Sequence, residues 1–150
     1  MKNRYHIPTP LYKKILAVMP VLTVDIVIAH EGKFLLLKRA IAPAKGQWWT
    51  PGGRVLKGEK LEEAARRKAK EETGISVKVV KLVGADGVLW KRGAQGVSSH
   101  TPSVIYLAHP TSKRVAVKTN FNNQEGMWFS RIPKGLHPFV KNALKAAKFR

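Results

Sequence analysis

Residues 51–75, PGGRVLKGEKLEEAARRKAKEETGI, decide the fold of this chain and carry most of its candidate chemistry. A run with helical periodicity begins near Lys60, ends near Thr73 and is followed by Gly74, a residue typical of helix C-termini. Although the chain holds 28 Lys and Arg, five of its nine acidic residues lie in this one stretch: Glu59, Glu62, Glu63, Glu71 and Glu72. Its carboxylates are therefore concentrated where a cation can use them.

One face of this helix combines carboxylates with an ammonium group. Helical spacing places Lys68 and Glu72 one turn apart, with Glu71 adjoining them. Glu72 is the metal-ligand candidate, because Mg²⁺ prefers a few oxygen ligands together with water and substrate phosphate. Lys68 beside it would either repel a second metal ion or contact a phosphate. Two further pairs are predicted to be exposed ion pairs: Glu62 with Arg66 and Glu63 with Arg67.

The spacing of the stretch resembles the Nudix box. Gly53 is followed after five residues by Glu59, after seven more by Arg67, and then by residues 68–75, KAKEETGI. The resemblance implies an α/β fold, the Nudix α/β/α sandwich with a mixed β-sheet. It also implies that helix glutamates bind Mg²⁺ or Mn²⁺ at a substrate diphosphate, with Glu71 joining Glu72. Lys68 departs from the family, which has there a Glu that holds a metal ion or acts as the base.

A second resemblance points to the substrate. Residues 35–55, LLLKRAIAPAKGQWWTPGGRV, look like the corresponding segment of GDP-mannose mannosyl hydrolases, a Nudix branch that also lacks the carboxylate at the Lys68 position. Those enzymes break the bond between the sugar carbon and the phosphate oxygen. The resemblance implies that Arg39 and Arg54 contact the diphosphate, and guanidinium groups suit phosphate oxygens. It also implies a metal ligand at the backbone carbonyl of Gly52.

The segment before the last predicted strand completes the implied site. Gln124 matches a metal-binding glutamine of the mannosyl hydrolases, and Glu125 replaces their histidine base. A carboxylate can serve as a general base when it is positioned on water. The alternative for Glu125 is a salt bridge to a nearby lysine.

Asp25 lies among apolar neighbours in a predicted strand, where an unpaired carboxylate would be costly. It matches an aspartate that the mannosyl hydrolases use, which implies contact with the sugar or with an arginine. The alternative is a structural ion pair with Arg39 or Arg54. Both interpretations stay open at this point.

The remaining pattern predicts an ordered series of short elements. The expected elements are a helix at residues 9–19 capped by Thr9, strands at 22–30 and 34–39 forming a hairpin, a loop at 40–51, a long or bent strand at 76–90 broken near 84–87 with Asp86 in a turn, a polar loop at 91–102 that contains His100, strands at 103–109 and around 128–129, and a helix at 136–149.

Composition bounds the class of protein. A chain of 150 residues with 44% apolar residues suits a single domain spanning residues 1–150. The net charge of +19 favours anionic partners. The absence of cysteine fits a reducing cytoplasm, and no apolar run approaches the roughly 20 residues that span a bilayer. We therefore expect a cytoplasmic protein without a membrane partner, and the family resemblance adds a homodimer.

Two classes of function follow. The first is a metal-dependent Nudix hydrolase of a nucleoside diphosphate derivative, with a GDP-mannose-like nucleotide sugar as substrate and sugar plus nucleoside diphosphate as products. The alternative is a Nudix-fold protein with reduced catalysis that binds RNA or the ribosome through its charge, motivated by Lys68 and the +19 net charge. Ordinary pyrophosphohydrolysis through Glu59, Glu71 and Glu72 stands third.

Overall fold

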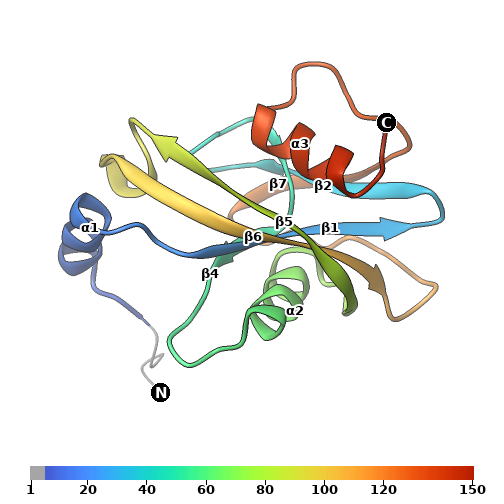
Figure 1. The fold of residues 1–150 in the computed structure, drawn as a ribbon, viewed down its shortest axis with the longest axis horizontal. Helices are drawn as coiled ribbons and strands as arrows, with labels where there is room; N and C mark the ends of the chain where they lie inside the picture. Colours follow the sequence, from blue (N-terminus) through green and yellow to red (C-terminus); the bar gives the residue numbers. More distant parts are fainter. Residues whose placement is uncertain (1–5) are drawn as a thin grey trace.

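The computed structural model describes residues 6–150 as a sheet flanked by helices (Figure 1). The elements, in chain order, are α1 (Thr9–Val18), β1 (Thr23–His30), β2 (Lys33–Arg39), β3 (Trp48–Trp49), β4 (Gly52–Arg54), α2 (Leu61–Thr73), β5 (Val77–Trp90), a 3₁₀ turn (Ala94–Gly96), β6 (Ser99–Pro110), β7 (Asn123–Phe129) and α3 (Pro138–Ala146). Across these described residues, each helix is too short or too polar to cross a lipid bilayer.

The sheet is mixed, as the Nudix resemblance implies. Its path runs β3-β2-β1-β6-β5, with β4 added to β1 and β7 added to β2. β1 and β6 are parallel, whereas the other pairs are antiparallel. The predicted hairpin of β1 and β2 forms, and beyond it β1 separates to pair with β4 and β6.

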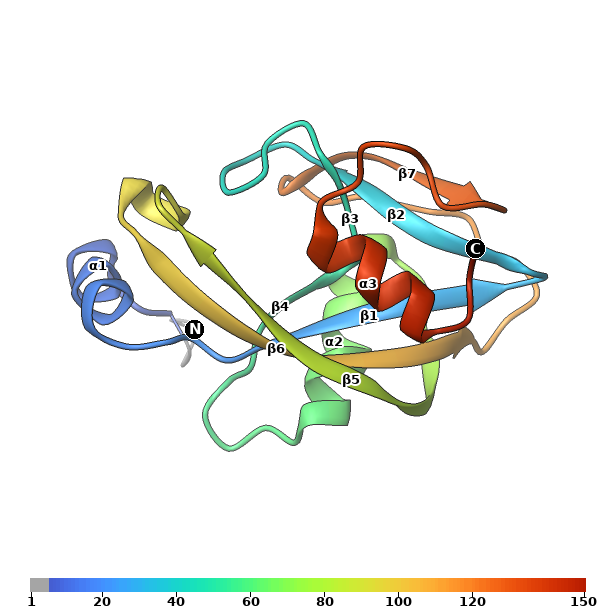
Figure 2. The same ribbon diagram turned by 45° about the horizontal axis from the view of Figure 1, so that its top comes forward.

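Alternating side chains of the central strands build two cores on opposite faces of the sheet. On one face, Val24, Ile26 and Ile28 of β1 pack with Leu35 and Leu37 of β2 against α2. α2 approaches closely because its buried side chains there are three alanines: Ala64, Ala65 and Ala69. The opposite face packs Val27, Phe34 and Leu36 against α3. Figure 2 shows the two helices on opposite sides of the sheet, which confirms the α/β/α sandwich.

The helix that carries the motif begins and ends close to its predicted bounds. Lys60 precedes its first turn, where the Glu63 carboxylate accepts a hydrogen bond from the Lys60 N–H at 3.2 Å. Gly74 ends it with φ 73°, a left-handed conformation that glycine adopts without strain. The first helix differs from expectation, because Pro8 takes the N-cap position and Thr9 makes no capping bond.

The pair β5 and β6 is longer than the sequence predicts. β5 continues through residues 84–87, and Asp86 pairs with Ser103 in the ladder instead of occupying a turn. Irregularities in register between Val79 and Lys81, and between Leu82 and Gly84, bend the strand without ending it. β6 begins at Ser99, so the last four residues of the predicted loop belong to a strand.

Candidate active site

Glu72 is the buried carboxylate of the site. Only 5% of the residue is exposed, because α2 lies against the sheet. Its Oε2 accepts a hydrogen bond from the N–H of Gly52 at 3.1 Å, and its Oε1 lies 3.3 Å from the Lys68 ammonium. The glycine loop and the end of α2 are therefore joined through one carboxylate, and a metal ligand at the Gly52 carbonyl stays a prediction.

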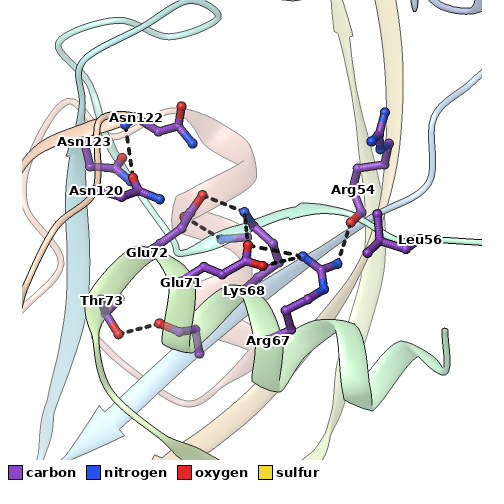
Figure 3. A network of polar contacts seen from close by, with 12 residues as sticks. Arg54, Leu56, Arg67, Lys68, Glu71, Glu72, Thr73, Asn120, Asn122 and Asn123 are labelled. Atoms are coloured by element: carbon purple, nitrogen blue, oxygen red, sulfur yellow. Dashed lines mark hydrogen bonds and ion pairs between the residues drawn. The ribbon is translucent and has the colours of Figure 1, made fainter. Parts of the chain in front are cut away.

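Lys68 lies between the two glutamates (Figure 3). Its Nζ donates to Oε2 of Glu71 at 3.1 Å, and its side chain is only 12% exposed. The backbone opposite makes room for it, because a Cβ on Gly53 would stand 2.6 Å from the Lys68 Cε. Lys68 thus places a fixed positive charge beside the carboxylates.

Arg67 ties the loop before α2 to the helix. Its Nε donates to Glu59 Oε1 at 2.6 Å and one terminal nitrogen to Glu59 Oε2 at 2.8 Å. The same terminal nitrogen donates to the carbonyl of Arg54 at 3.0 Å. These hydrogen bonds from Arg67 hold the pKa of Glu59 below its ordinary value.

One of the two predicted surface pairs on α2 forms. Arg66 lies 3.8 Å from Glu62. Arg67 bonds to Glu59 and Glu71, whereas the described hydrogen bond of Glu63 is to the backbone of Lys60. The prediction of a Glu63–Arg67 pair is therefore wrong, because the fork of Arg67 finds a two-point contact with Glu59.

A cavity opens beside the glycine loop. We call it the Asp25 cavity; its lining includes Tyr12, Asp25, Arg39, Thr50, Gly52 and Arg54. Its volume of about 200 Å³ lies below the roughly 300–1,000 Å³ typical of ligand pockets. It offers carboxylate, hydroxyl and guanidinium groups, which suit a polyhydroxylated ligand next to an anion.

Asp25 is held by hydroxyl groups. Thr50 donates to its Oδ1 at 2.7 Å and Ser103 to its Oδ2 at 2.5 Å. Burial raises the pKa of Asp25 to about 6 against the lowering effect of these hydrogen bonds, and the charge of Glu72 raises it further. Two hydroxyl contacts therefore stand at Asp25 in place of an ion pair with Arg39, and neither Thr50 nor Ser103 carries a sequence signal for this role.

Arg39 lies in the field of both carboxylates. Its Nε donates to the carbonyl of Pro43 at 2.6 Å, which orients the guanidinium from the loop side. Burial lowers the pKa of Arg39, and the charges of Glu72 and Asp25 oppose that shift. The structure thus brings Arg39 to the Asp25 cavity, and its contact with a diphosphate stays a prediction.

A second cavity adjoins the first. We call it the Phe121 cavity; its lining includes Tyr12, Arg54, Arg67, Lys68, Phe121 and Asn122, and its volume is about 450 Å³. Tyr12 and Arg54 line both cavities. The Arg54 guanidinium carbon lies 5.3 Å from the centroid of the Tyr12 ring. Sequence reasoning missed Tyr12, since one tyrosine in a surface helix carries no motif.

Gln124 and Glu125 lie apart from these groups. Both are exposed on β7, and Glu125 faces Lys38 at 3.6 Å. Neither is among the lining residues of the Asp25 or Phe121 cavity. Gln124 as a metal ligand and Glu125 as a base stay predictions, while the alternative of a lysine salt bridge for Glu125 matches the observed contact.

His100 lies outside both cavities, whereas Trp49 borders one of them. His100 is in β6, opposite Leu89, and is exposed. Trp49 is 8% exposed and stacks on Phe139 in the core under α3, with ring centroids 5.5 Å apart, and it also lines the Asp25 cavity.

The donor set fits a single hard cation. Within residues 6–150 no group of three or more His, Cys, Asp or Glu is arranged to hold a metal ion. Mg²⁺ is often bound by only one or two carboxylates, completed by water and substrate phosphate. Glu71 and Glu72 offer such a pair, and carboxylate oxygens accept more than one bond each. Lys68 stands where it would disfavour a second cation.

Comparisons with known proteins bear on the family and the fold of this chain. A family model described as NUDIX domain matches residues 19–135. The low-salt glycan biosynthesis protein Agl8 of Haloferax volcanii is 32% identical over 147 residues, covering 97% of this chain and 93% of that protein. The ADP-ribose pyrophosphatase of Methanocaldococcus jannaschii is 32% identical over 115 residues, covering 77% and 66%. The crystal structure of a MutT NUDIX hydrolase from Burkholderia pseudomallei superimposes with a TM-score of 0.73 at 30% identity, covering 85% and 98%.

Proposed function

The chain belongs to the NUDIX-domain family, and on that premise we propose that it is a metal-dependent hydrolase of a nucleotide sugar or a related nucleoside diphosphate derivative. The observation that carries the proposal is the junction of buried Glu72 with the Gly52 N–H and the Lys68 ammonium, beside a cavity that holds Asp25 and Arg39. Relatives named for glycan biosynthesis and for ADP-ribose support this class of substrate.

Glu72 and Glu71 would hold one divalent ion, Mg²⁺ or Mn²⁺, with the Gly52 backbone beside them. When bound, the ion supplies charge neutralisation at the diphosphate. Arg39 and Arg54 add guanidinium donors at the Asp25 cavity. Such preorganised groups stabilise the charge that develops on a departing diphosphate.

Lys68 takes the role of a second cation in this proposal. Its ammonium is held by two carboxylates and shielded from solvent, so it contributes positive charge without recruiting another ion. The mannosyl hydrolases that the sequence resembles hydrolyse their substrate at the sugar carbon. That reaction needs fewer metal ligands than attack at phosphorus. The GDP-mannose-like reaction is therefore the form we favour: the oxygen of water bonds to the sugar carbon and releases a proton to solvent, while the bond from that carbon to the phosphate oxygen breaks and its electrons leave with the nucleoside diphosphate.

Asp25 is suited to bind the sugar end. It lines the Asp25 cavity together with hydroxyl-bearing side chains, and its own contacts to Thr50 and Ser103 fix its orientation. A carboxylate held in place by two hydroxyls can accept a further hydrogen bond from a substrate hydroxyl.

The test is turnover in oxygen-18 water with Mg²⁺ or Mn²⁺, using a panel of nucleotide sugars, ADP-ribose and nucleoside triphosphates. We expect label in the free sugar. Label in a phosphate would replace the mannosyl-hydrolase-like reaction by pyrophosphohydrolysis, and absence of turnover on every substrate would overturn the enzyme assignment.

Glu72→Gln should abolish that turnover with the fold intact. Glu62→Gln is the matched control, because Glu62 lies on the same helix in an exposed pair with Arg66. Equal activity in both variants would remove Glu72 from the site.

A second candidate function rests on charge alone. The net charge of +19 favours binding to RNA, including ribosomal RNA. Such binding should weaken steeply as salt rises, and binding that is unchanged between low and high salt would refute it.

A further inference from the structure

Helix α1 lies outside the segment that matches the family model. The match begins at residue 19, whereas α1 spans Thr9–Val18. Figure 1 shows α1 at the end of the sheet, beside β6, rather than in either helix layer of the sandwich. α1 nevertheless contributes Tyr12 to both cavities of the candidate active site.

The ring of Tyr12 contacts Arg54, the arginine that lines both cavities. The Arg54 guanidinium carbon lies 5.3 Å from its ring centroid, within the range of a cation–π contact. The backbone of Arg54 is fixed independently: β4 pairs it with Thr23 of β1, and its carbonyl accepts a bond from Arg67 at 3.0 Å. Strand pairing therefore sets where the side chain starts, and the Tyr12 ring helps to set where it ends.

The two cavities suit the two ends of one ligand. The Asp25 cavity is small, at about 200 Å³, and rich in hydrogen-bonding groups. The Phe121 cavity, of about 450 Å³, carries an aromatic side chain whose residue is 84% exposed. Exposed aromatic faces can stack on nucleobases. The residues shared by the cavities are a cation and the ring that contacts it, so an anionic centre between two ends fits their junction.

We propose that Tyr12 is a positioning residue that holds the Arg54 guanidinium at the junction of the two cavities, where it binds the diphosphate of a substrate whose ends occupy both. The inference rests on the proposed function and adds to it a residue from outside residues 19–135, the segment that the family model matches. A guanidinium whose plane is held in advance loses less freedom when it forms a two-point contact with phosphate.

The experiment measures dissociation constants of ADP-ribose and GDP-mannose by calorimetry, in EDTA so that no metal-dependent turnover interferes. Tyr12→Leu removes the ring, Tyr12→Phe keeps it, and Leu11→Ala changes an exposed neighbour on the same helix. We expect Tyr12→Leu to weaken binding of at least one probe roughly three- to thirtyfold. Tyr12→Phe and Leu11→Ala should stay within about twofold of the unmodified protein.

A double-mutant cycle separates positioning from a direct or purely structural role. If Tyr12 works through Arg54, adding Tyr12→Leu to Arg54→Ala should weaken binding no further than Arg54→Ala alone. Tyr12 is half-buried and lies in neither core cluster, so Tyr12→Leu should unfold at nearly the same temperature.

Three results would overturn the inference. Tyr12→Leu could bind the probes as tightly as the unmodified protein does. Adding Tyr12→Leu to Arg54→Ala could weaken binding by the product of the two single effects. Tyr12→Phe could weaken binding as much as Tyr12→Leu does. Absence of binding of either probe to the unmodified protein, together with absence of turnover in the oxygen-18 panel, would instead refute the proposed function itself and this inference with it.

Discussion

Replacing Asp25 by Asn should change how the free energy of unfolding depends on pH. Burial raises the pKa of Asp25 from 3.8 to about 6 in the folded protein. The folded state therefore holds this proton more tightly than the unfolded chain does. The stability that the protonated carboxyl contributes is present in full below about pH 4 and is lost as pH rises through about 6.

The magnitude follows from that gap. Each unit of pKa corresponds to about 1.4 kcal/mol, so a pKa of about 6 in place of 3.8 corresponds to a maximal contribution of about 3 kcal/mol to the free energy of unfolding. The asparagine side chain would be neutral at every pH, and its amide can accept from one of the hydroxyls of Thr50 and Ser103 while donating to the other. The stability of Asp25→Asn relative to the unmodified protein should therefore rise by about 2–3 kcal/mol between pH 4 and pH 7.5.

Urea unfolding, followed by circular dichroism and tryptophan fluorescence at half-unit pH steps, measures this difference directly. Asp86→Asn is the matched control, because it makes the same change at a carboxylate that is exposed on β5. A difference between Asp25→Asn and the unmodified protein that is constant across this range would refute the argument that burial dominates at Asp25.

Three further predictions concern the motif and its surroundings. Arg67→Ala should destabilise the fold by about 2 kcal/mol at pH 7, because it breaks the two-point contact with Glu59; since the pKa of Glu59 is lowered in the folded state, this contribution is present above its ordinary pKa of 4.5 and is lost as pH falls below it, so urea titrations that show the same loss at pH 3 would contradict it. Gly53→Ala should cost about 1–3 kcal/mol, since its φ of 153° is strained for other residues and the new Cβ displaces Lys68; thermal unfolding checks the cost, and an unchanged midpoint would argue against it. Glu125→Gln should lower kcat less than tenfold, because the described contact of Glu125 is with the half-buried Lys38 outside both cavities; a loss of about 10²–10⁴ in steady-state kinetics would establish it as the base.

Local pattern was enough to predict the helices and most strands. The bounds of α2 follow from a run of helix formers ended by Gly74, and the β-branched and leucine-rich runs predict β1 and β2. The same reasoning predicted that β6 begins at residue 103 instead of Ser99, and it placed Asp86 in a turn instead of in β5. A polar segment beside a long partner strand can form backbone hydrogen bonds with that strand, and its own composition does not predict this pairing.

The sequence by itself determined the membership of the family and the grouping of Glu72, Lys68 and the glycine loop, because box spacing and helical periodicity are written locally along the chain. Only the tertiary structure decided which partners those side chains have. The hydroxyls of Thr50 and Ser103 reach Asp25 from positions 25 and 78 residues away in the chain, and Tyr12 reaches Arg54 from a helix before the family segment. Such contacts depend on how strands pair and helices pack, so no local pattern encodes them.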